Sequence, residues 1–308
     1  MNKQATTQNV SVPWERPADA SYVPGRVGVV GLGLIGGSFA KAFAAAGNKA
    51  YACNRSASTI QLALVETIAG VLDEQTIPSC ELIILSLYPE ANVAWLERHA
   101  ELISPGAIVI DTAGTKRGIC DRCFELAGVH PFQFCGGHPM AGTHHSGFGH
   151  ATADLFSGAP MVLVPPPLTD IERLVLLDRI KTLLAPCKFG SYSQTTANNH
   201  DRIIAFSSQL AHVVSNAYIK SPTRSDHQGF SAGSYRDLTR VAKLNPQMWT
   251  ELFLDNADNL IFEIDQIIAE LTQYREALAE GDAQTLCELL AEGDRLKRED
   301  MQRENHIS

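Results

Sequence analysis

Short apolar runs separated by turns dominate the first part of the chain. Val27–Val30 is a β-branched run that predicts a buried strand, and apolar runs over 49–53, 81–87 and 107–110 predict further strands. Segments of helical length lie between these runs, and short turns join them. Strands that alternate with helices in this way predict an α/β fold with a Rossmann-type, doubly wound parallel sheet.

Beyond Ser193 the apolar residues recur at the steps of three and four that are typical of helices. One apolar face consists of five residues: Ile203, Phe206, Leu210, Val213 and Ala217. Another stripe, Asp201, Ala205, Ser208 and His212, is more polar. Polar groups need partners if they are buried, which favours His212 facing a cleft. A solvated stripe is the alternative.

A second helical segment follows Pro246 and continues the pattern without a break. Its apolar positions are Phe253, Ala257, Leu260, Ile264, Ile267, Leu271, Tyr274 and Leu278. A repeat of three and a half residues requires a long helical partner. Gly281 predicts the end of this helix, and Asp282 can cap the next one. Because little chain remains to cover this surface, we expect pairing with a second subunit.

The predicted organisation is therefore a tail over 1–25, a dinucleotide-binding domain over 26–193 and an all-α domain over 194–303. Of the 308 residues, 45% are hydrophobic and 19% are charged, as in globular proteins. The net charge of −9 opposes non-specific binding to nucleic acid or to anionic membranes. No apolar run reaches membrane-spanning length, and no secretory signal precedes the first strand. Seven scattered cysteines fit a reducing compartment, so we expect a cytoplasmic protein.

A glycine-rich loop gives the first indication of chemistry. The sequence Gly31-Leu32-Gly33-Leu34-Ile35-Gly36 follows the first predicted strand and opens a helix. In that context the pattern predicts a dinucleotide site. Gly31 permits the tight turn, Gly33 lets the backbone approach a pyrophosphate, and Gly36 lets the helix pack closely on the strand. The helix N-terminus would then bind the phosphates.

The end of the second predicted strand indicates which dinucleotide is bound. An acidic residue there would bond the ribose 2′-hydroxyl of NAD, but this chain has Asn54-Arg55-Ser56. The missing acid, the arginine and the hydroxyl favour NADP over NAD, although Arg55 pointing to solvent is the alternative. Neighbours of the nicotinamide are expected at the ends of the later strands, among Ser86, Thr112, Gly114 and Thr115.

His138 is expected in a loop of small residues, Gly136-Gly137-His138-Pro139-Met140-Ala141-Gly142, which follows another short strand. Such a histidine suits proton transfer near neutral pH, and activity is then expected to fall as the pH drops through about 6.5. A histidine that merely bonds a backbone carbonyl is the alternative. No metal site is expected, because the pair Cys120 and Cys123 lacks a second pair and the histidines at 144, 145 and 150 lack acidic partners.

Taken together, five motifs closely resemble the prephenate dehydrogenase family of tyrosine biosynthesis. They are Gly31-x-Gly33-x-x-Gly36, Asp111-x-x-x-x-Lys116, the run 137–142, His200-Asp201 and the run 234–240. The resemblance extends from about Arg26 to the C-terminal helices. It implies oxidative decarboxylation of prephenate or arogenate with hydride transfer to a nicotinamide cofactor. It also implies a homodimer, in the form of the family without an ACT regulatory domain.

The resemblance implies catalytic or binding roles for three residues. His138 would take the proton of the substrate's 4-hydroxyl, His212 would be a second active-site histidine, and Arg240 would bind a substrate carboxylate. The chain departs from the family at Gly114, where many members have serine, and at Gln209, where some have histidine. Thr115 could supply the missing hydroxyl. A β-hydroxyacid dehydrogenase or imine reductase, and a dinucleotide-binding paralogue without activity, are the alternatives.

Overall fold

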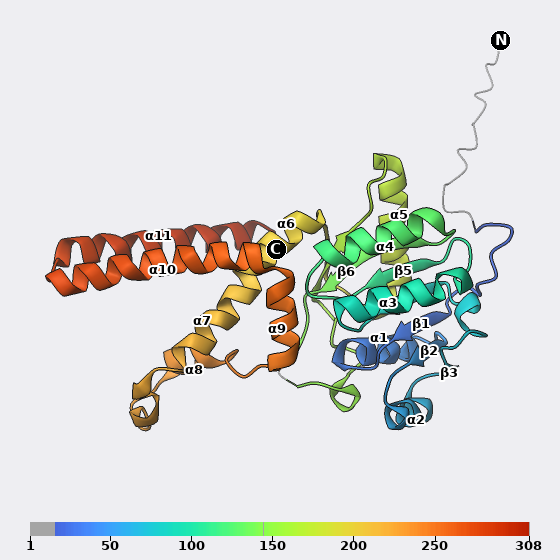
Figure 1. Cartoon of the computed structure of the whole chain (residues 1–308), viewed down its shortest axis with the longest axis horizontal. Helices are drawn as coiled ribbons and strands as arrows, with labels where there is room; N and C mark the ends of the chain where they lie inside the picture. Colours follow the sequence, from blue (N-terminus) through green and yellow to red (C-terminus); the bar gives the residue numbers. More distant parts are fainter. Residues whose placement is uncertain (1–15, 144, 308) are drawn as a thin grey trace, which may run out of the picture.

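An α/β domain and a helical domain follow one another along the longest axis of the molecule (Figure 1). The structure, a computed structural model, describes residues 16–143 and 145–307. One eight-stranded sheet has the order β3-β2-β1-β4-β5-β6-β7-β8. Its strands are β1 Val27–Val30, β2 Ala50–Cys53, β3 Gly70–Val71, β4 Leu82–Leu85, β5 Ile108–Asp111, β6 Gln133–Pro139, β7 Pro160–Val164 and β8 Ser191–Gln194.

The sheet is doubly wound, as the alternation of strands and helices predicts. Every neighbouring pair of strands is parallel except β6 and β7, which pair antiparallel. The covering helices are α1 Leu34–Ala45, α2 Ala57–Glu66, α3 Pro89–His99, α4 Arg117–Val129 and α5 Asp170–Leu183. Side chains of α1, α2 and α5 bury one face of the sheet, and those of α3 and α4 bury the other. The carboxyl ends of β1, β2, β4 and β5 therefore share one edge, where ligands of such sheets bind.

The segment before β1 packs on the α/β domain over residues 16–25. Tyr22 is only 3% exposed and belongs to the core beneath α3 and α4. The backbone N–H groups of Ser21 and Tyr22 donate to the hydroxyl of Ser104 at 2.8 and 3.2 Å. Ordered chain thus begins before Arg26, and the remainder of the expected tail, 1–15, lies outside the described residues.

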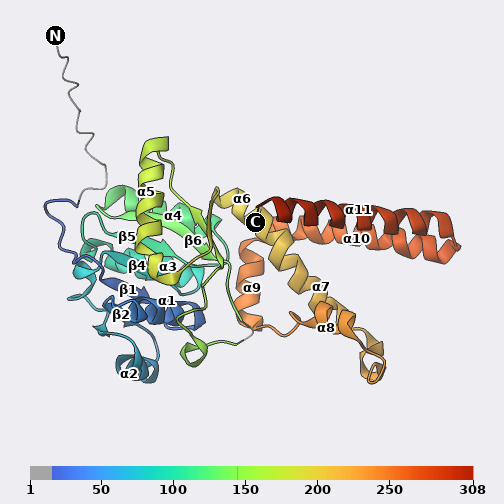
Figure 2. The same ribbon diagram turned by 180° about the vertical axis from the view of Figure 1, so that it is seen from behind.

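The second domain is entirely helical. Its elements are α6 Ala197–Ile204, a π-helical segment Ala205–Leu210, α7 Ala211–Tyr218, α8 Gly233–Thr239, α9 Pro246–Asp255, α10 Ala257–Glu280 and α11 Ala283–Ile307. Figures 1 and 2 show α10 and α11 as a hairpin that extends away from the sheet, and α7 and α8 as a second arm. Helix α9 stands between these arms and the sheet.

Two helices differ from the sequence expectation. The apolar pattern from Phe253 to Ala257 crosses a break at Asn256, whose φ of −126° and ψ of 29° leave the helical region. The two helices also differ in burial, because α10 buries Leu260 and Ala277 whereas no residue of α9 is fully buried. The helix through His212 is also interrupted, by the π-helical segment. Gly281 ends α10 with a φ of +69°, as predicted, and Asp282 accepts hydrogen bonds from the next helix.

The helical domain exposes much apolar surface within the described chain. Ile203 and Phe206 are 45% and 64% exposed. Further exposed apolar side chains on the hairpin are Ile261, Phe262, Ile268, Leu271, Leu278, Leu290 and Leu296. None of the described helices combines the length and apolarity needed to cross a bilayer.

Candidate active site

The glycine loop joins β1 to α1 in the shape that its sequence predicts. Gly31 has a φ of +94°, a conformation that favours glycine. A Cβ on Gly36 would lie 1.9 Å from the carbonyl oxygen of Gly31, so only glycine permits this approach of helix and strand. A Cβ on Gly33 would meet nothing within 4 Å, and Gly33 leaves the start of α1 without a side-chain cap. Space and uncapped helix N–H groups therefore occur together, and they fit the pyrophosphate of a dinucleotide.

The predicted cofactor neighbours lie around this loop. Asn54 accepts a hydrogen bond from the backbone N–H of Leu32 at 3.1 Å, which ties the end of β2 to the loop. Arg55 and Ser56 are exposed beside it, and the Ser56 hydroxyl caps α2 by accepting from Thr59 N–H. At the ends of β4 and β5, the hydroxyl of Thr112 donates to that of Ser86 at 3.1 Å. Leu34 and Ile35 form the first turn of α1.

His138, near the end of β6, forms a hydrogen-bonded chain with two residues of α6. Its Nδ1 lies 2.9 Å from Nε2 of His200, and Nδ1 of His200 lies 2.7 Å from Oδ1 of Asp201. An ionised carboxylate only accepts hydrogen bonds, so Nδ1 of His200 carries a proton and donates it. With His200 neutral, its Nε2 accepts from Nδ1–H of His138, and the free lone pair of His138 lies on Nε2. His138 is therefore arranged as a base.

The surroundings of the chain keep both imidazoles neutral. Burial, and then the neighbouring His200 and Lys116, hold the pKa of His138 well below its ordinary value. Burial also lowers the pKa of His200, although its hydrogen bond to Asp201 acts in the opposite direction. Burial alone would raise the pKa of Asp201, but hydrogen bonds from His200 and from the N–H groups of Arg117 and Lys116 lower it overall.

A buried ion pair lies next to the backbone that carries His138. Lys116 and Asp111 are fully buried and paired with each other. Asp111 also accepts hydrogen bonds from the N–H groups of Ala113 at 2.8 Å and Gly137 at 3.0 Å. A Cβ on Gly137 would lie 2.6 Å from the carbonyl oxygen of Asp111, so glycine lets β6 approach β5 here. The Asp-x-x-x-x-Lys motif thus fixes the backbone next to His138.

Asp201 also joins the two domains. Its carboxylate accepts from the backbone N–H of Lys116 at 2.7 Å and of Arg117 at 2.9 Å, which caps the start of α4 from the neighbouring domain. The guanidinium of Arg117 bonds Asp258 and also donates to Asn256 at 3.0 Å. Asp201 therefore holds α6 on the α/β domain and supports His200 at the same time.

The predicted neighbours Gly114 and Thr115 face α9. A Cβ on Gly114 would lie 3.3 Å from Leu252, and the hydroxyl of Thr115 donates to Asp255 at 3.4 Å. The Thr115 hydroxyl thus contacts the helical domain.

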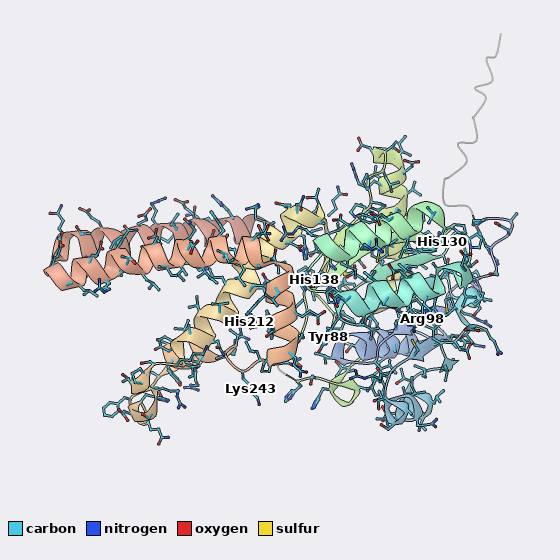
Figure 3. All side chains as sticks on the ribbon, viewed as in Figure 1. Tyr88, Arg98, His130, His138, His212 and Lys243 are labelled. Atoms are coloured by element: carbon cyan, nitrogen blue, oxygen red, sulfur yellow. The ribbon has the colours of Figure 1, made fainter. Side chains whose placement is uncertain are left out.

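His212 and Arg240 lie farther along the helical domain, and none of the described contacts joins them to His138 or to each other. The imidazole of His212 stacks on Trp249 with ring centroids 3.9 Å apart, and its Nδ1–H donates to the Ser208 carbonyl at 2.8 Å. Figure 3 shows His212 on α7 beside α9, and His138 at the junction with the sheet. Arg240 follows α8 and is exposed at the edge of a largely apolar groove of about 360 Å³. The groove is lined by Phe206, Leu210, Ala211, Val214, Asp237, Leu238, Arg240, Val241 and Ile267.

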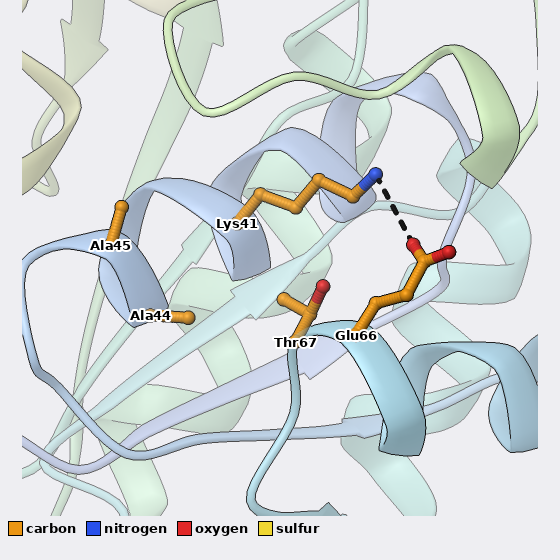
Figure 4. A pocket seen from close by; sticks show the side chains of 5 residues that line it. All are labelled: Lys41, Ala44, Ala45, Glu66 and Thr67. Carbon is orange, nitrogen blue, oxygen red and sulfur yellow. Dashed lines mark ion pairs between the residues drawn. The ribbon is translucent and has the colours of Figure 1, made fainter.

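A second hollow, of about 420 Å³, lies between α1 and α2 and shares no lining residue with this site (Figure 4). Lys41 and Glu66 form an ion pair across it at 3.7 Å. The residues from 16 to 143 and 145 to 307 contain no group of three His, Cys, Asp or Glu side chains placed to bind a metal ion. His145 stacks on His150 with ring centroids 4.5 Å apart, and the histidine at 144 lies outside the described residues.

Sequence reasoning did not assign roles to several residues of this site. His200, Asp111 and Lys116 belong only to the family motifs, Asp201 belongs to a motif and to the polar helical stripe, and no sequence pattern marks Asn256. Apart from the local pairs Lys116 with Asp111 and His200 with Asp201, their contacts link positions that are distant in the chain. One signal was available: a His-Asp pair on a predicted helix needs partners wherever that helix is buried.

Comparison with known proteins identifies the family. A family model described as "Prephenate dehydrogenase, nucleotide-binding domain" matches residues 39–190, and one described as "Prephenate dehydrogenase, dimerization domain" matches 196–292. Prephenate dehydrogenase of Bacillus subtilis is 28% identical over 274 residues, which cover 84% of this chain and 71% of that protein.

Solved structures agree with this match. Arogenate dehydrogenase of Synechocystis is 30% identical, with a TM-score of 0.73, and the match covers 89% of this chain and 99% of that one. Prephenate dehydrogenase of A. aeolicus, solved with hydroxyphenyl propionate and NAD+, is 27% identical with a TM-score of 0.77, over 91% and 99% of the two chains. The chain therefore belongs to the prephenate dehydrogenase family of nicotinamide-dependent oxidoreductases.

Proposed function

We propose that the protein catalyses the oxidative decarboxylation of prephenate or arogenate with NAD(P)+. The observation that carries the proposal is the neutral imidazole of His138, which is hydrogen-bonded to His200 and Asp201 at the edge of the sheet that also holds the glycine loop. A solved relative that holds both NAD+ and a hydroxyphenyl compound supports the same chemistry. Family membership decides against a β-hydroxyacid dehydrogenase.

The reaction needs a base for one hydroxyl proton. Bound NAD(P)+ supplies the hydride acceptor. As a hydride leaves the ring carbon that bears the 4-hydroxyl, Nε2 of His138 accepts the hydroxyl proton. The bond from the ring to its carboxylate then breaks, carbon dioxide leaves, and the electron pair enters the ring, which becomes aromatic. Asp201 fixes the tautomer of His200, and His200 accepts from Nδ1–H of His138, so the pair keeps the lone pair of His138 on Nε2, where it can accept the proton.

We propose that the loop 31–36 and the start of α1 bind the cofactor phosphates and that Ser86 and Thr112 lie near the nicotinamide. The choice of NADP over NAD rests on Arg55 and Ser56 at the end of β2, where no acidic residue stands. Arg55→Ala should raise the KM for NADP and leave that for NAD nearly unchanged. Equal effects on both cofactors would remove Arg55 from cofactor selection.

Arg240 is proposed to bind a substrate carboxylate, because a guanidinium grips a carboxylate with two parallel hydrogen bonds. His212 is proposed as a second substrate contact, since its Nε2 remains free while Nδ1–H bonds Ser208. Arg240→Ala should chiefly raise the substrate KM, and Arg240→Lys should restore little of it. Arg236, exposed on α8 just before Arg240, is the matched control. An unchanged substrate KM in Arg240→Ala would show that Arg240 does not bind the substrate carboxylate.

A homodimer formed through the helical domain is proposed as the functional unit. The apolar side chains that the described chain leaves exposed on α6, α10 and α11 support it, as does the family description of this region. A cytoplasmic location is proposed as well. All seven cysteines are free and five of them are buried, which fits a reducing compartment.

One experiment tests the function directly. The purified protein is incubated with prephenate or arogenate, each with NAD or NADP, and formation of the reduced nicotinamide is measured. Turnover with at least one pair supports the proposal, and the preferred pair identifies substrate and cofactor. His138→Asn should lower kcat by about 10²–10⁴-fold. Cofactor binding without any turnover would indicate a paralogue that lacks the activity.

A further inference from the structure

Asn256, at the break between α9 and α10, has no exposed surface and no place in the mechanism above. Its Nδ2 donates to the backbone carbonyl of Asp201 and to Oε1 of Gln209, both at 2.8 Å. Its Oδ1 accepts from Arg117 at 3.0 Å and from Asn259 at 2.9 Å. Both donors and both acceptor sites of the amide are thus used, which fixes its orientation.

The ordinary reason for an asparagine at such a place is helix capping. Asn256 precedes α10, yet its side chain makes no capping hydrogen bond to the first turn of that helix. Asn245, which precedes α9, shows the usual arrangement: its Oδ1 accepts from the N–H groups of Gln247 and Met248. The side chain of Asn256 is directed instead to α6, to the π-helical segment and to α4.

Gln209 continues the network into the widened turn. It is 2% exposed, and its Nε2 donates to the Leu252 carbonyl at 2.9 Å while its Oε1 accepts from Asn256. Because π-helical turns are rare and concentrate at functional sites, the interruption of a long helix next to His200 is informative. Asn256 and Gln209 therefore fix the position of this turn relative to the backbone of Asp201.

We propose that Asn256 is a positioning residue for catalysis, which holds Asp201 and through it fixes the orientation of the His200–His138 pair. This inference rests on the proposed function. Asn256 touches neither imidazole. It binds the backbone of Asp201, and it also binds Arg117, whose N–H bonds the Asp201 carboxylate. A small shift of this carboxylate moves His200 and removes the acceptor for Nδ1–H of His138.

The pH dependence gives a readout that a merely structural role would not change. From α6, His200 faces His138 and is itself bonded to Asp201. Asp111 at the end of β5 and Lys116 at the start of α4 form the neighbouring ion pair. From β7, Val162 pairs with His138 and adds no charge. If His200 withdraws, water reaches His138 and a neighbour that disfavours its charge is lost. The apparent pKa on the acid side of the pH profile of kcat/KM then rises toward the ordinary histidine value of about 6.5.

The test compares Asn256→Ala with Asn245→Ala in the full-length protein. Asn245→Ala removes a cap in the same domain outside the network, so it controls for lost stability. We expect Asn256→Ala to lower kcat by up to about 100-fold at saturating cofactor and to raise the acid limb, while Asn245→Ala changes neither. In a double-mutant cycle with Asp201→Asn the two effects on kcat should overlap rather than add.

Histidine titration by NMR separates this inference from the proposed function. His138→Asn assigns the His138 signal, and its pKa should rise in Asn256→Ala whether or not substrate is turned over. If wild type turns over neither substrate but the signal shifts, the proposed function fails and the positioning role stands. If Asn256→Ala keeps the wild-type titration and behaves like Asn245→Ala, the positioning role is wrong. If Asn256→Ala does not fold, Gln209→Met, which preserves volume, is judged by the same two readouts.

Discussion

Asp201→Asn is the substitution for which the structure predicts the most specific failure. The carboxylate accepts from Lys116 N–H and His200 Nδ1–H at 2.7 Å on one oxygen, and from Arg117 N–H at 2.9 Å on the other. Asparagine has nearly the same shape but only one accepting oxygen. In either orientation, therefore, its NH2 group faces at least one backbone N–H.

Both orientations have a cost that can be worked out. Losing a charge-assisted hydrogen bond costs about 1.5–3 kcal/mol, and leaving a buried donor unpaired costs about 1–3 kcal/mol more. The sum, about 2.5–6 kcal/mol, is a large part of the total stability of a domain. When the NH2 group faces His200, that imidazole must accept at Nδ1 and donate at Nε2. His138 would then carry its proton on Nε2 and could not act as a base, so kcat should fall by about 10²–10⁴-fold.

The assay pairs urea unfolding at pH 7 with steady-state formation of reduced nicotinamide. Asp258→Asn is the matched control, because Asp258 bonds the same Arg117 but is largely exposed, and surface pairs contribute at most about 1 kcal/mol. Since the pKa of Asp201 is lowered in the folded state, its contribution is present above the unfolded value of about 3.9 and is lost as the pH falls through the folded value. The difference in the free energy of unfolding between wild type and Asp201→Asn should therefore shrink as the pH falls through that range. A folded Asp201→Asn enzyme with a kcat within twofold of wild type would refute the reasoning.

Three further outcomes are expected. Gly36→Ala should lower both thermal stability and dinucleotide affinity, because its Cβ meets the Gly31 carbonyl, whereas Gly33→Ala should lower affinity alone; equal melting temperatures for the two variants would contradict this. The pKa values of His138 and His200 are lowered in the folded state, so the free energy of unfolding should decline as the pH falls below about 6.5. The decline is up to about 1.4 kcal/mol per pH unit for each imidazole, and chemical denaturation of His138→Asn should show a smaller slope. Leu271→Glu, on the exposed apolar face of α10, should shift sedimentation to that of a monomer, while Gln273→Glu should not; a Leu271→Glu dimer of undiminished affinity would place the interface elsewhere.

The lowered pKa of His138 also revises an expectation from the sequence. The sequence predicts that His138 lies in a loop and titrates near about 6.5, where activity would fall, but the structure places it in strand β6. Because His138 is partly buried beside His200 and Lys116, its pKa is lowered, and the pH at which activity falls on the acid side should lie below about 6.5. No local pattern around His138 encodes this shift, since Lys116 and His200 come from other parts of the chain.

What the sequence determined by itself is the local structure and the type of chemistry. The apolar run Val27–Val30 and the glycines at 31, 33 and 36 specify a strand, a turn and a helix start, because steric limits and periodicity act over a few residues. The five motifs together were sufficient to indicate the family.

Only the tertiary structure decided which distant groups meet. His138 and His200 are 62 positions apart, and Arg117 and Asp258 are 141 apart, so their pairing depends on how two domains pack rather than on any spacing in the sequence. Packing also broke the helix at Asn256 and turned Thr115 toward Asp255, against the local pattern. Periodicity reports which side of a helix is buried, but the partner on that side is fixed by the free energy of the whole fold, because a buried polar group is stable only where a matching group from elsewhere in the chain satisfies it.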